Sequence, residues 1–281
     1  MEDELIFLDE LVSLIKQKKE LSPLDDDFVK EVVRSSSFTV EKNYDSFDQF
    51  KRSKLCKEIV SSVRKRLRDI YGLFLEKPLS TKHIDRLESI EATSLLSLHK
   101  STLERAPYYP SLYPLLLEKL HEMGLKKDYV LADIACGYNP LAVQFLPVRP
   151  KEYFACDLSS KDMAAIDYFF KKFGVKGGAE AYDVLGTRFE EFFSGKKFDV
   201  CFLFKALDPF EQVKRHASKR LLSSLPTEFF VVSFSLFSIG GKTPIPASKR
   251  SWFEKFCQKQ SWEFQTLQIP NELFYLIKTG K

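Results

Sequence analysis

The sequence predicts an α/β protein in which an all-helical amino-terminal domain precedes a domain built on a mostly parallel, seven-stranded sheet. The first observation behind this prediction is a change of pattern near Tyr129. Before it, apolar residues recur at helical spacing; after it, short β-rich runs alternate with helical stretches, as in βαβ units. The second observation is that the last two strand-like runs are joined by only four residues, 269–272. Because so short a connection cannot cross over between parallel strands, this final pair is expected to be antiparallel.

Residues 1–97 are expected to form the helical domain and residues 98–281 the sheet domain. In the first helix, Leu8, Leu11 and Ile15 recur on one face. Helices are predicted over residues 4–19, 25–35, 47–74, 81–98 and 112–123. Strand-type alternation is nearly absent from the first 122 residues, so this part of the chain is not expected to join the sheet.

Seven strands are predicted in the second domain, with helices between them. The strands are expected over residues 129–134, 152–156, 178–182, 198–204, 229–234, 263–268 and 273–278. The helices are expected over residues 141–145, 161–173, 190–193, 209–225 and 248–260. Five parallel strands followed by an antiparallel pair outline the sheet of class I (Rossmann-like) methyltransferases, and that is the predicted fold.

Composition and charge limit the classes of protein to consider. A net charge of +4 over 281 residues permits a polyanionic partner without requiring one. The acidic start lacks the basic region of a signal peptide, and no apolar run approaches the length of a membrane span. Five scattered cysteines, with no Cys-x-x-Cys pair, argue against a zinc site and a disulfide framework. We therefore expect a cytoplasmic protein with no membrane segment and no metal, and a monomer by default.

The loop after the first strand has the pattern of a nucleotide-binding turn. Asp133 ends the strand, Gly137 permits a tight turn, and a helix follows. Asp157 ends the second strand 20 residues after Gly137, at the spacing where an acid holds ribose hydroxyls. Ala135 and Asn139 stand where a dinucleotide-binding loop has glycines, and Asp133 would repel a pyrophosphate. A cationic sulfonium ligand fits better, so the pattern predicts S-adenosyl-L-methionine as the cofactor.

Two motifs extend this pattern: HKSTLER at residues 99–105 and ACGYNPLA at residues 135–142. Together they resemble the 16S rRNA (guanine-N7) methyltransferases of the aminoglycoside-resistance type. Further matches follow in order at residues 183–185, 204–205, 233–234, 238–242, 252–253 and 271–273. The resemblance covers residues 95–280 and implies that the helical domain is a basic, RNA-docking domain. Leu103, Ser235 and Phe237 depart from the family's pattern near the expected RNA surface, which leaves the target nucleotide open.

The resemblance also implies roles for individual positions. The residues predicted to bind the cofactor are His99, Ser101, Thr102, Arg105, Asp133, Ala135, Gly137, Asn139, Asp157, Leu158, Asp183, Val184, Leu185 and Phe204. Arg105 would pair with the methionine carboxylate, and Asp157 would hold the ribose. Asp183 would accept a hydrogen bond from the adenine amino group, although the residues alone equally allow it to cap a turn. Phe204 and Lys205, at the end of the fourth strand, would face the reacting methyl group and are the predicted catalytic residues.

The residues around the fourth strand favour guanine N7 as the methyl acceptor. N7 has an available lone pair, so catalysis needs positioning rather than a strong base. Methylation of an exocyclic amine would predict Asn/Asp-Pro-Pro-aromatic after this strand, where the chain has FKALDP at residues 204–209. The base must be flipped out or already unpaired, and Phe204, Phe234 or Phe237 could stack on it. Each could instead be a core residue, which for Phe234 is the favoured interpretation, and Lys205 could be a surface lysine.

A dense basic segment predicts an RNA-binding face. Between Lys51 and Arg68 there are eight basic residues and one acid, Glu58. On a helix they would position a phosphate backbone without reading sequence, although a solvated helix face is the alternative. The predicted RNA-binding residues are Lys51, Arg52, Lys54, Lys57, Arg64, Lys65, Arg68 and Lys242. The leading hypothesis is a methyltransferase that modifies guanine N7 in small-subunit rRNA; a tRNA guanine methyltransferase, a small-molecule methyltransferase and a non-catalytic RNA-binding protein are the alternatives.

Overall fold

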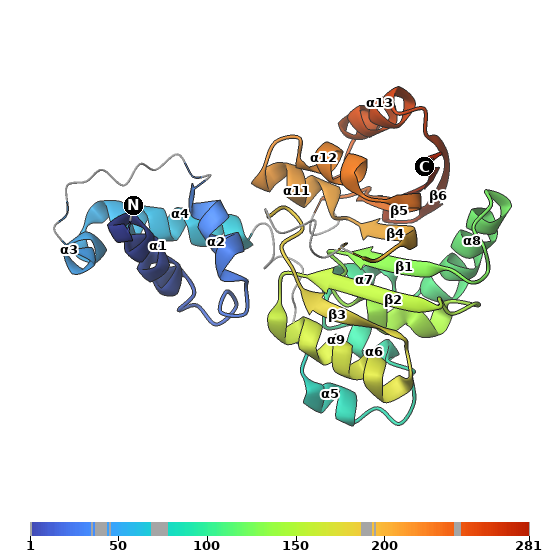
Figure 1. Ribbon diagram of the computed structural model, residues 1–281, viewed down its shortest axis with the longest axis horizontal. Helices are drawn as coiled ribbons and strands as arrows, with labels where there is room; N and C mark the ends of the chain where they lie inside the picture. The colour runs from blue at the N-terminus through green and yellow to red at the C-terminus, as the bar shows by residue number, and fades with distance from the viewer. Residues whose placement is uncertain are drawn as a thin grey trace.

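The computed structural model contains an amino-terminal group of helices beside a larger α/β body (Figure 1). It describes residues 2–34, 36, 44, 46–68, 78–186, 193, 195–238 and 243–280. A seven-stranded mixed sheet forms the centre of the larger body, and helices cover both of its faces. The predicted fold class, a class I sheet domain preceded by helices, is confirmed.

The amino-terminal group shares one apolar core. Its helices are α1 (Glu2–Ile15), α2 (Asp26–Arg34), α3 (Phe47–Arg52) and α4 (Lys54–Leu67). Val29, Phe50 and Leu67 are fully buried in this core. The single helix predicted over residues 47–74 is wrong, because Ser53 is extended and its hydroxyl accepts a hydrogen bond from the Cys56 N–H at 3.0 Å, which caps a new helix. The end of that predicted helix, residues 69–74, lies outside the described residues.

The sheet has the strand order β3-β2-β1-β4-β5-β7-β6. Its strands are β1 (Val130–Ile134), β2 (Glu152–Asp157), β3 (Gly177–Ala181), β4 (Phe198–Phe204), β5 (Thr227–Ser235), β6 (Glu263–Ile269) and β7 (Glu272–Lys278). Strands β1 to β5 pair in parallel, whereas β7 runs antiparallel to β5 and β6, as the short final connection predicted. The strand order reverses between β1 and β4, which is where open α/β sheets form a ligand-binding crevice at their carboxyl ends.

Helices pack on both faces of the sheet. They are α5 (Thr81–Asp85), α6 (Thr93–Leu96), α7 (Lys100–Arg105), α8 (Tyr109–Glu122), the 3-10 helix η2 (Asn139–Phe145), α9 (Ser160–Phe173), α11 (Leu207–Val213), α12 (Ala217–Ser224), the 3-10 helix η3 (Ala247–Arg250) and α13 (Ser251–Lys259). The helix predicted over residues 209–225 is instead two helices, because His216 is left-handed at φ +62° and the Glu211 carboxylate accepts from the N–H groups of His216 and Ser218. The helix predicted over residues 190–193 falls outside the described residues except for Phe193.

Residues 78–97 pack against the sheet rather than against the amino-terminal helices. Ile84 and Leu96 are fully buried in the core that lies under α9. The ammonium of Lys172 donates to three carbonyl oxygens at the end of α5, including that of Ile84 at 3.0 Å. The Leu79 N–H donates to the Tyr138 hydroxyl at 2.7 Å. By its contacts, this segment therefore belongs with the α/β body.

The amino-terminal helices meet the α/β body beside the carboxyl ends of the parallel strands. Leu24 forms an antiparallel bridge with Ser159, just after β2. The guanidinium of Arg66, on α4, donates to the carbonyl oxygens of Gln212 and Val213 at 3.0 Å. These contacts place α2 and α4 next to the crevice of the sheet.

Candidate active site

A cavity opens at the carboxyl ends of β1, β2 and β4. Its volume is about 770 Å³ with the open mouth included. Most of the residues predicted to bind the cofactor line it: His99, Ser101, Ala135, Gly137, Asp157, Leu158, Asp183, Val184, Leu185 and Phe204. Lys205, predicted to be catalytic, lines it as well. The structure thus gathers one predicted site from five separate stretches of sequence.

Asp157 is oriented by two backbone groups. Its Oδ2 accepts from the Gly137 N–H at 2.8 Å, and its Oδ1 accepts from the Leu158 N–H at 2.7 Å. Each carboxylate oxygen keeps a further lone pair for a ligand. Burial raises the pKa of Asp157 to about 6, against the opposing effect of the two N–H groups. At neutral pH the group is therefore mostly ionised and able to accept hydrogen bonds from hydroxyls.

Asp183 stands beside an apolar wall of the same cavity. Its Oδ1 accepts from the Leu185 N–H at 2.9 Å, which is the turn-capping contact that the sequence allowed. Its carboxylate also lines the cavity, so capping and ligand binding are compatible. Burial raises the pKa of Asp183 to about 6. With Leu158, Val184 and Phe28 around it, this part of the cavity suits a purine that carries an exocyclic amine.

The loop between β1 and η2 holds an unusual backbone shape. Ala135 and Gly137 are both left-handed, at φ 53° and 51°. A side chain at residue 137 would bring its Cβ within 2.7 Å of the His99 ring, so only glycine fits there. Ala135 adopts this conformation at a cost of about 1–2 kcal/mol, and strained residues of this kind cluster at functional sites. Burial lowers the pKa of His99 to about 3, so its ring is neutral at physiological pH.

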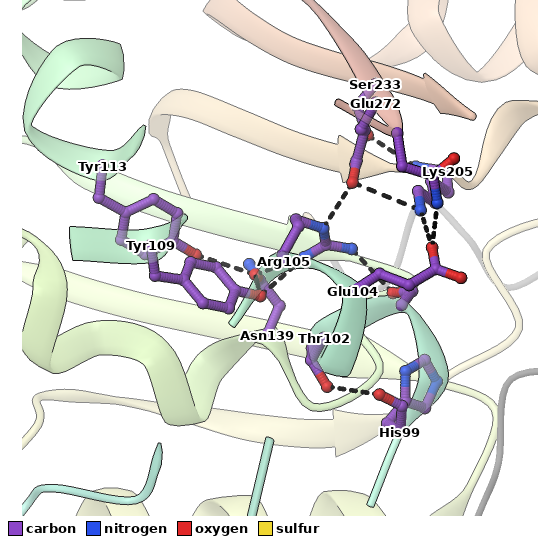
Figure 2. Close-up of polar contacts among 12 residues, drawn as sticks. His99, Thr102, Glu104, Arg105, Tyr109, Tyr113, Asn139, Lys205, Ser233 and Glu272 are labelled. Carbon is purple, nitrogen blue, oxygen red and sulfur yellow. Dashed lines mark hydrogen bonds and ion pairs between the residues drawn. The ribbon is translucent and has the colours of Figure 1, made fainter. Parts of the chain in front are cut away.

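Arg105 is fully buried, and Figure 2 shows the polar side chains that surround its guanidinium. Its Nε donates to Glu272 Oε2 at 2.9 Å, and both side chains are 1% exposed. Its Nη1 donates to the Tyr109 hydroxyl and to Asn139 Oδ1, and its Nη2 donates to Ser101 Oγ at 2.8 Å. Ser101 lines the cavity whereas Arg105 does not. Ser101 therefore connects the buried guanidinium to the cavity.

Phe204 and Lys205 close the inner end of the cavity. The Phe204 ring stacks on Phe202 at 4.8 Å between ring centroids, and the Arg105 guanidinium lies 5.0 Å from its centroid. Lys205 is left-handed at φ 56°, and its side chain is 7% exposed. Its ammonium lies 2.6 Å from Glu104 Oε2 and 3.5 Å from Glu272 Oε2 (Figure 2). The surface-lysine alternative for Lys205 is therefore wrong, because both carboxylates hold it inside.

The other predicted cofactor residues, Thr102, Asp133 and Asn139, also lie behind the wall. Thr102 Oγ1 donates to the carbonyl oxygens of Leu96 and His99, so it braces the start of α7. Asp133 Oδ2 accepts from Asn139 Nδ2 at 2.8 Å and from the Tyr153 hydroxyl at 2.7 Å. Burial raises the pKa of Asp133 to about 7. In this structure these residues shape the cofactor loop without reaching the cavity.

The predicted RNA-binding residues divide into exposed and structural ones. Lys51, Arg52, Lys54, Lys57 and Lys65 are exposed. The guanidinium of Arg64 instead donates to the carbonyl oxygens of Leu14 and Ile15, at 2.7 and 3.1 Å, and so holds the end of α1. Arg68 pairs with Glu20 at 3.2 Å. Lys242 lies outside the described residues. Lys54, Lys57, Lys65 and Arg68 share one face of α4 at spacings of three, eight and three residues.

The structure adds cavity residues that the sequence did not reveal. They are Phe28, Tyr182, Ala206, Pro209, Phe210 and Val213. Phe28 comes from α2, in the amino-terminal group, and no local pattern connects that helix with the cofactor loop. The residues from Ala206 onward follow Lys205 in sequence, so extending the predicted site along the segment after β4 would have included them.

Comparison with known proteins decides the family. The family model "Ribosomal RNA methyltransferase (FmrO)" matches residues 56–276. The chain belongs to this family. A 16S rRNA (guanine(1405)-N(7))-methyltransferase of Micromonospora rosea is 28% identical to it over 78% of this chain and 82% of the relative. Membership confirms the predicted resemblance and the predicted class of enzyme.

Solved structures agree with the fold. The superposition on an rRNA methylase from Escherichia coli includes 97% of this chain and 99% of the methylase, with a TM-score of 0.67 and 24% identity. The 16S rRNA methyltransferase RmtF, solved with S-adenosyl-L-homocysteine, covers 97% of this chain and matches over 98% of its own, with a TM-score of 0.70 and 20% identity. At these identities the likeness concerns the fold, including its amino-terminal helices.

The cavity of this rRNA methyltransferase fits the predicted cofactor, S-adenosyl-L-methionine. Asp157 and Asp183 offer acceptors for ribose hydroxyls and for an adenine amine. In the described part of the chain, no group of three or more His, Cys, Asp or Glu side chains could hold a metal ion. No helix within the described ranges is long and apolar enough to cross a membrane.

Proposed function

We propose that this rRNA methyltransferase transfers a methyl group from S-adenosyl-L-methionine to N7 of a guanine in small-subunit rRNA. The observation that carries the proposal is the chemistry at the inner end of the cavity. Lys205 is held by two carboxylates, and the imidazole of His99 is neutral, with its pKa lowered to about 3. Neither is arranged as a strong general base, which suits an acceptor atom that already has a lone pair. The relative from Micromonospora rosea is named for guanine N7.

The cofactor is proposed to lie along the cavity from Asp183 to Ser101. Asp157 would accept from the ribose hydroxyls, and Asp183 from the adenine amine, with Phe28 against the purine. Ser101 would donate to the methionine carboxylate, and the buried charge of Arg105 would act on that carboxylate through Ser101. This arrangement is a refinement of the direct Arg105 contact expected from the sequence.

The protein's own contribution to the reaction is positioning. When bound, S-adenosyl-L-methionine supplies a methyl group that passes to the N7 lone pair as the bond to sulfur breaks. Phe204 and Lys205 would form a rigid wall against which the acceptor base binds. Packing on Phe202 immobilises Phe204, and two ion pairs immobilise Lys205. Holding two reactants in line is worth several orders of magnitude in rate. Since N7 carries no proton, no residue has to remove one.

The amino-terminal helices are proposed to dock the enzyme on RNA. The exposed lysines of α3 and α4 form a basic face that is suited to a phosphate backbone. From the packing of residues 78–97, we place the division between the docking and catalytic units between residues 68 and 78. We further propose that the enzyme acts as a monomer in the cytoplasm, where its substrate is assembled.

The experiment that tests this proposal is methyl transfer from labelled S-adenosyl-L-methionine to four substrates in parallel: small ribosomal subunits, naked 16S rRNA, tRNA, and a small-molecule extract. The expected result is label in the small subunit or its rRNA. Label in tRNA alone would favour a tRNA guanine methyltransferase, and label in the extract alone would favour a small-molecule enzyme. No transfer to any of them, with the cofactor still bound, would contradict the proposal.

A further inference from the structure

A second cavity adjoins the cofactor cavity at its reactive end. Its volume is about 850 Å³ with its open mouth included. Ser101, Lys205 and Pro209 line both cavities, so the two meet beside the predicted catalytic lysine. The second cavity continues away from the cofactor along α7, α11 and the segment after β5. A methyl acceptor has to reach Lys205 from the side that the cofactor leaves free, and this cavity is on that side.

The lining of this second cavity combines a flat ring with hydrogen-bonding groups of both kinds. Phe237 supplies the ring, held by a bridge between residues 237 and 244. Lys205 and Lys100 supply donors. Asp208 and Gln212, one turn apart on α11, line only this cavity and supply acceptors at a distance from the cofactor. Rings that stack, together with polar groups at the base edge, are how proteins hold unpaired bases.

The two carboxylates that line this cavity, Glu104 and Asp208, differ in whether they already have partners. Glu104 Oε2 is 2.6 Å from the Lys205 ammonium and accepts from Asn271 Nδ2 at 2.8 Å. Asp208 is exposed at the mouth of the second cavity and has no hydrogen-bond or ion-pair partner among the residues that the structure describes. Partial desolvation by the surrounding protein raises the pKa of its carboxyl group, and the nearby cations Arg250 and Lys249 oppose this shift. Asp208 is therefore the carboxylate that is free to accept from a ligand.

We propose that the second cavity is the pocket for the target base and that Asp208 selects guanine in it. With N7 directed at the cofactor, the neighbouring O6 lies near the donors at the Lys205 junction. The Watson–Crick edge, with its N1–H and N2–H donors, then turns toward α11, where the two oxygens of Asp208 accept from both. Adenine has a lone pair at N1 and no amine at C2, so the same carboxylate repels it. This inference rests on the proposed function.

The test compares the wild type with Asp208→Asn on small subunits reconstituted with either guanosine or inosine at the position that the wild type methylates. Inosine keeps N7, O6 and N1–H but lacks the 2-amino group. We expect Asp208→Asn to lower kcat/KM for guanine-containing subunits by about 10- to 100-fold, the usual value of one bidentate base contact. With inosine-containing subunits, the kcat/KM of the wild type should fall by a similar factor. The kcat/KM of Asp208→Asn should fall little further. Affinity for S-adenosyl-L-methionine should not change.

Two further variants make the result specific. Asp208→Glu keeps a carboxylate and should retain more activity than Asp208→Asn. Asp128→Asn removes one exposed negative charge at the other end of the sheet and should behave as the wild type. An inosine penalty of the same size in the wild type and in Asp208→Asn would overturn the inference, as would wild-type kinetics or a loss of cofactor affinity in that variant. A wild-type enzyme that forms no 7-methylguanosine at all would instead contradict the proposed function.

Discussion

Replacing Glu272 by Gln removes the negative charge that the buried cations of the active site share. The carboxylate lies 2.9 Å from the Arg105 guanidinium and 3.5 Å from the Lys205 ammonium, and its side chain is 1% exposed. The glutamine keeps the shape and can still accept from the Ser233 hydroxyl, so the change isolates the charge. Removing one partner of a buried ion pair costs about 3–5 kcal/mol. That is a large part of the total stability of about 5–15 kcal/mol that is usual for a folded protein.

The assay for this variant is denaturant unfolding, followed by the fluorescence of Trp252 and Trp262. We expect the free energy of unfolding to fall by about 3–5 kcal/mol and, in a parallel thermal melt, the melting temperature to fall by about 5–9 °C. Glu263→Gln, at an exposed position of the neighbouring strand, is the matched control and should change stability by less than about 0.5 kcal/mol. A loss below about 1 kcal/mol in Glu272→Gln would show that the charge of Arg105 is balanced elsewhere and not by Glu272.

Four further predictions concern the binding of the cofactor and of RNA. Asp157→Asn should weaken S-adenosyl-L-methionine binding by about 10- to 100-fold in calorimetry, the effect of losing a charged acceptor. Because the pKa of Asp157 is raised to about 6 and hydroxyls favour its ionised form, wild-type affinity should be constant above pH 7 and should fall as pH drops through 6. Phe28→Leu should weaken cofactor binding by about two- to tenfold, the value of one aromatic contact. The triple variant Lys54→Glu, Lys57→Glu, Lys65→Glu should weaken RNA binding and lower the salt slope by about two to three.

Each of these predictions has its own control and refuting result. Affinity that does not change between pH 5 and 8 would contradict the role of Asp157. Phe50→Leu alters a buried ring of the same helical core away from the cavity, and an equal loss there would make the Phe28 effect structural. Lys126→Glu, Lys127→Glu, Lys151→Glu reverses three exposed charges before β1 and β2, at the opposite edge of the sheet. An equal loss of RNA binding in that variant would refute a specific basic face on α4.

The strands could be predicted from the sequence because each buried strand is a short local run. The β4 segment, Phe198–Phe204, is apolar over nearly its whole length, and the hairpin of β6 and β7 follows from the length of one connection. Helix ends were less predictable where a single side chain decides them. Ser53 divides one apolar stripe into two helices by a capping bond that periodicity does not contain.

The features of the site that the sequence does not determine depend on contacts between distant segments. Arg105 has the type and position of a ligand-binding residue, yet its partner Glu272 lies 167 residues away and appears only in the fold. In the sequence, Lys205 is a lysine at the end of a strand. Only the fold shows that Glu104 and Glu272 pair with it. Phe28 reaches the cavity only because α2 packs beside the ends of the strands. Local patterns predict the cofactor loop; they do not predict which charges balance each other across the sheet.

Nucleoside mass spectrometry of small-subunit rRNA, after incubation with the enzyme and labelled S-adenosyl-L-methionine, tests the proposed reaction directly, with Asp157→Asn in parallel. We expect one labelled 7-methylguanosine per subunit with the wild type and a strongly reduced yield with the variant. Label in a different nucleoside, or none in rRNA while the cofactor still binds, would contradict the proposed reaction.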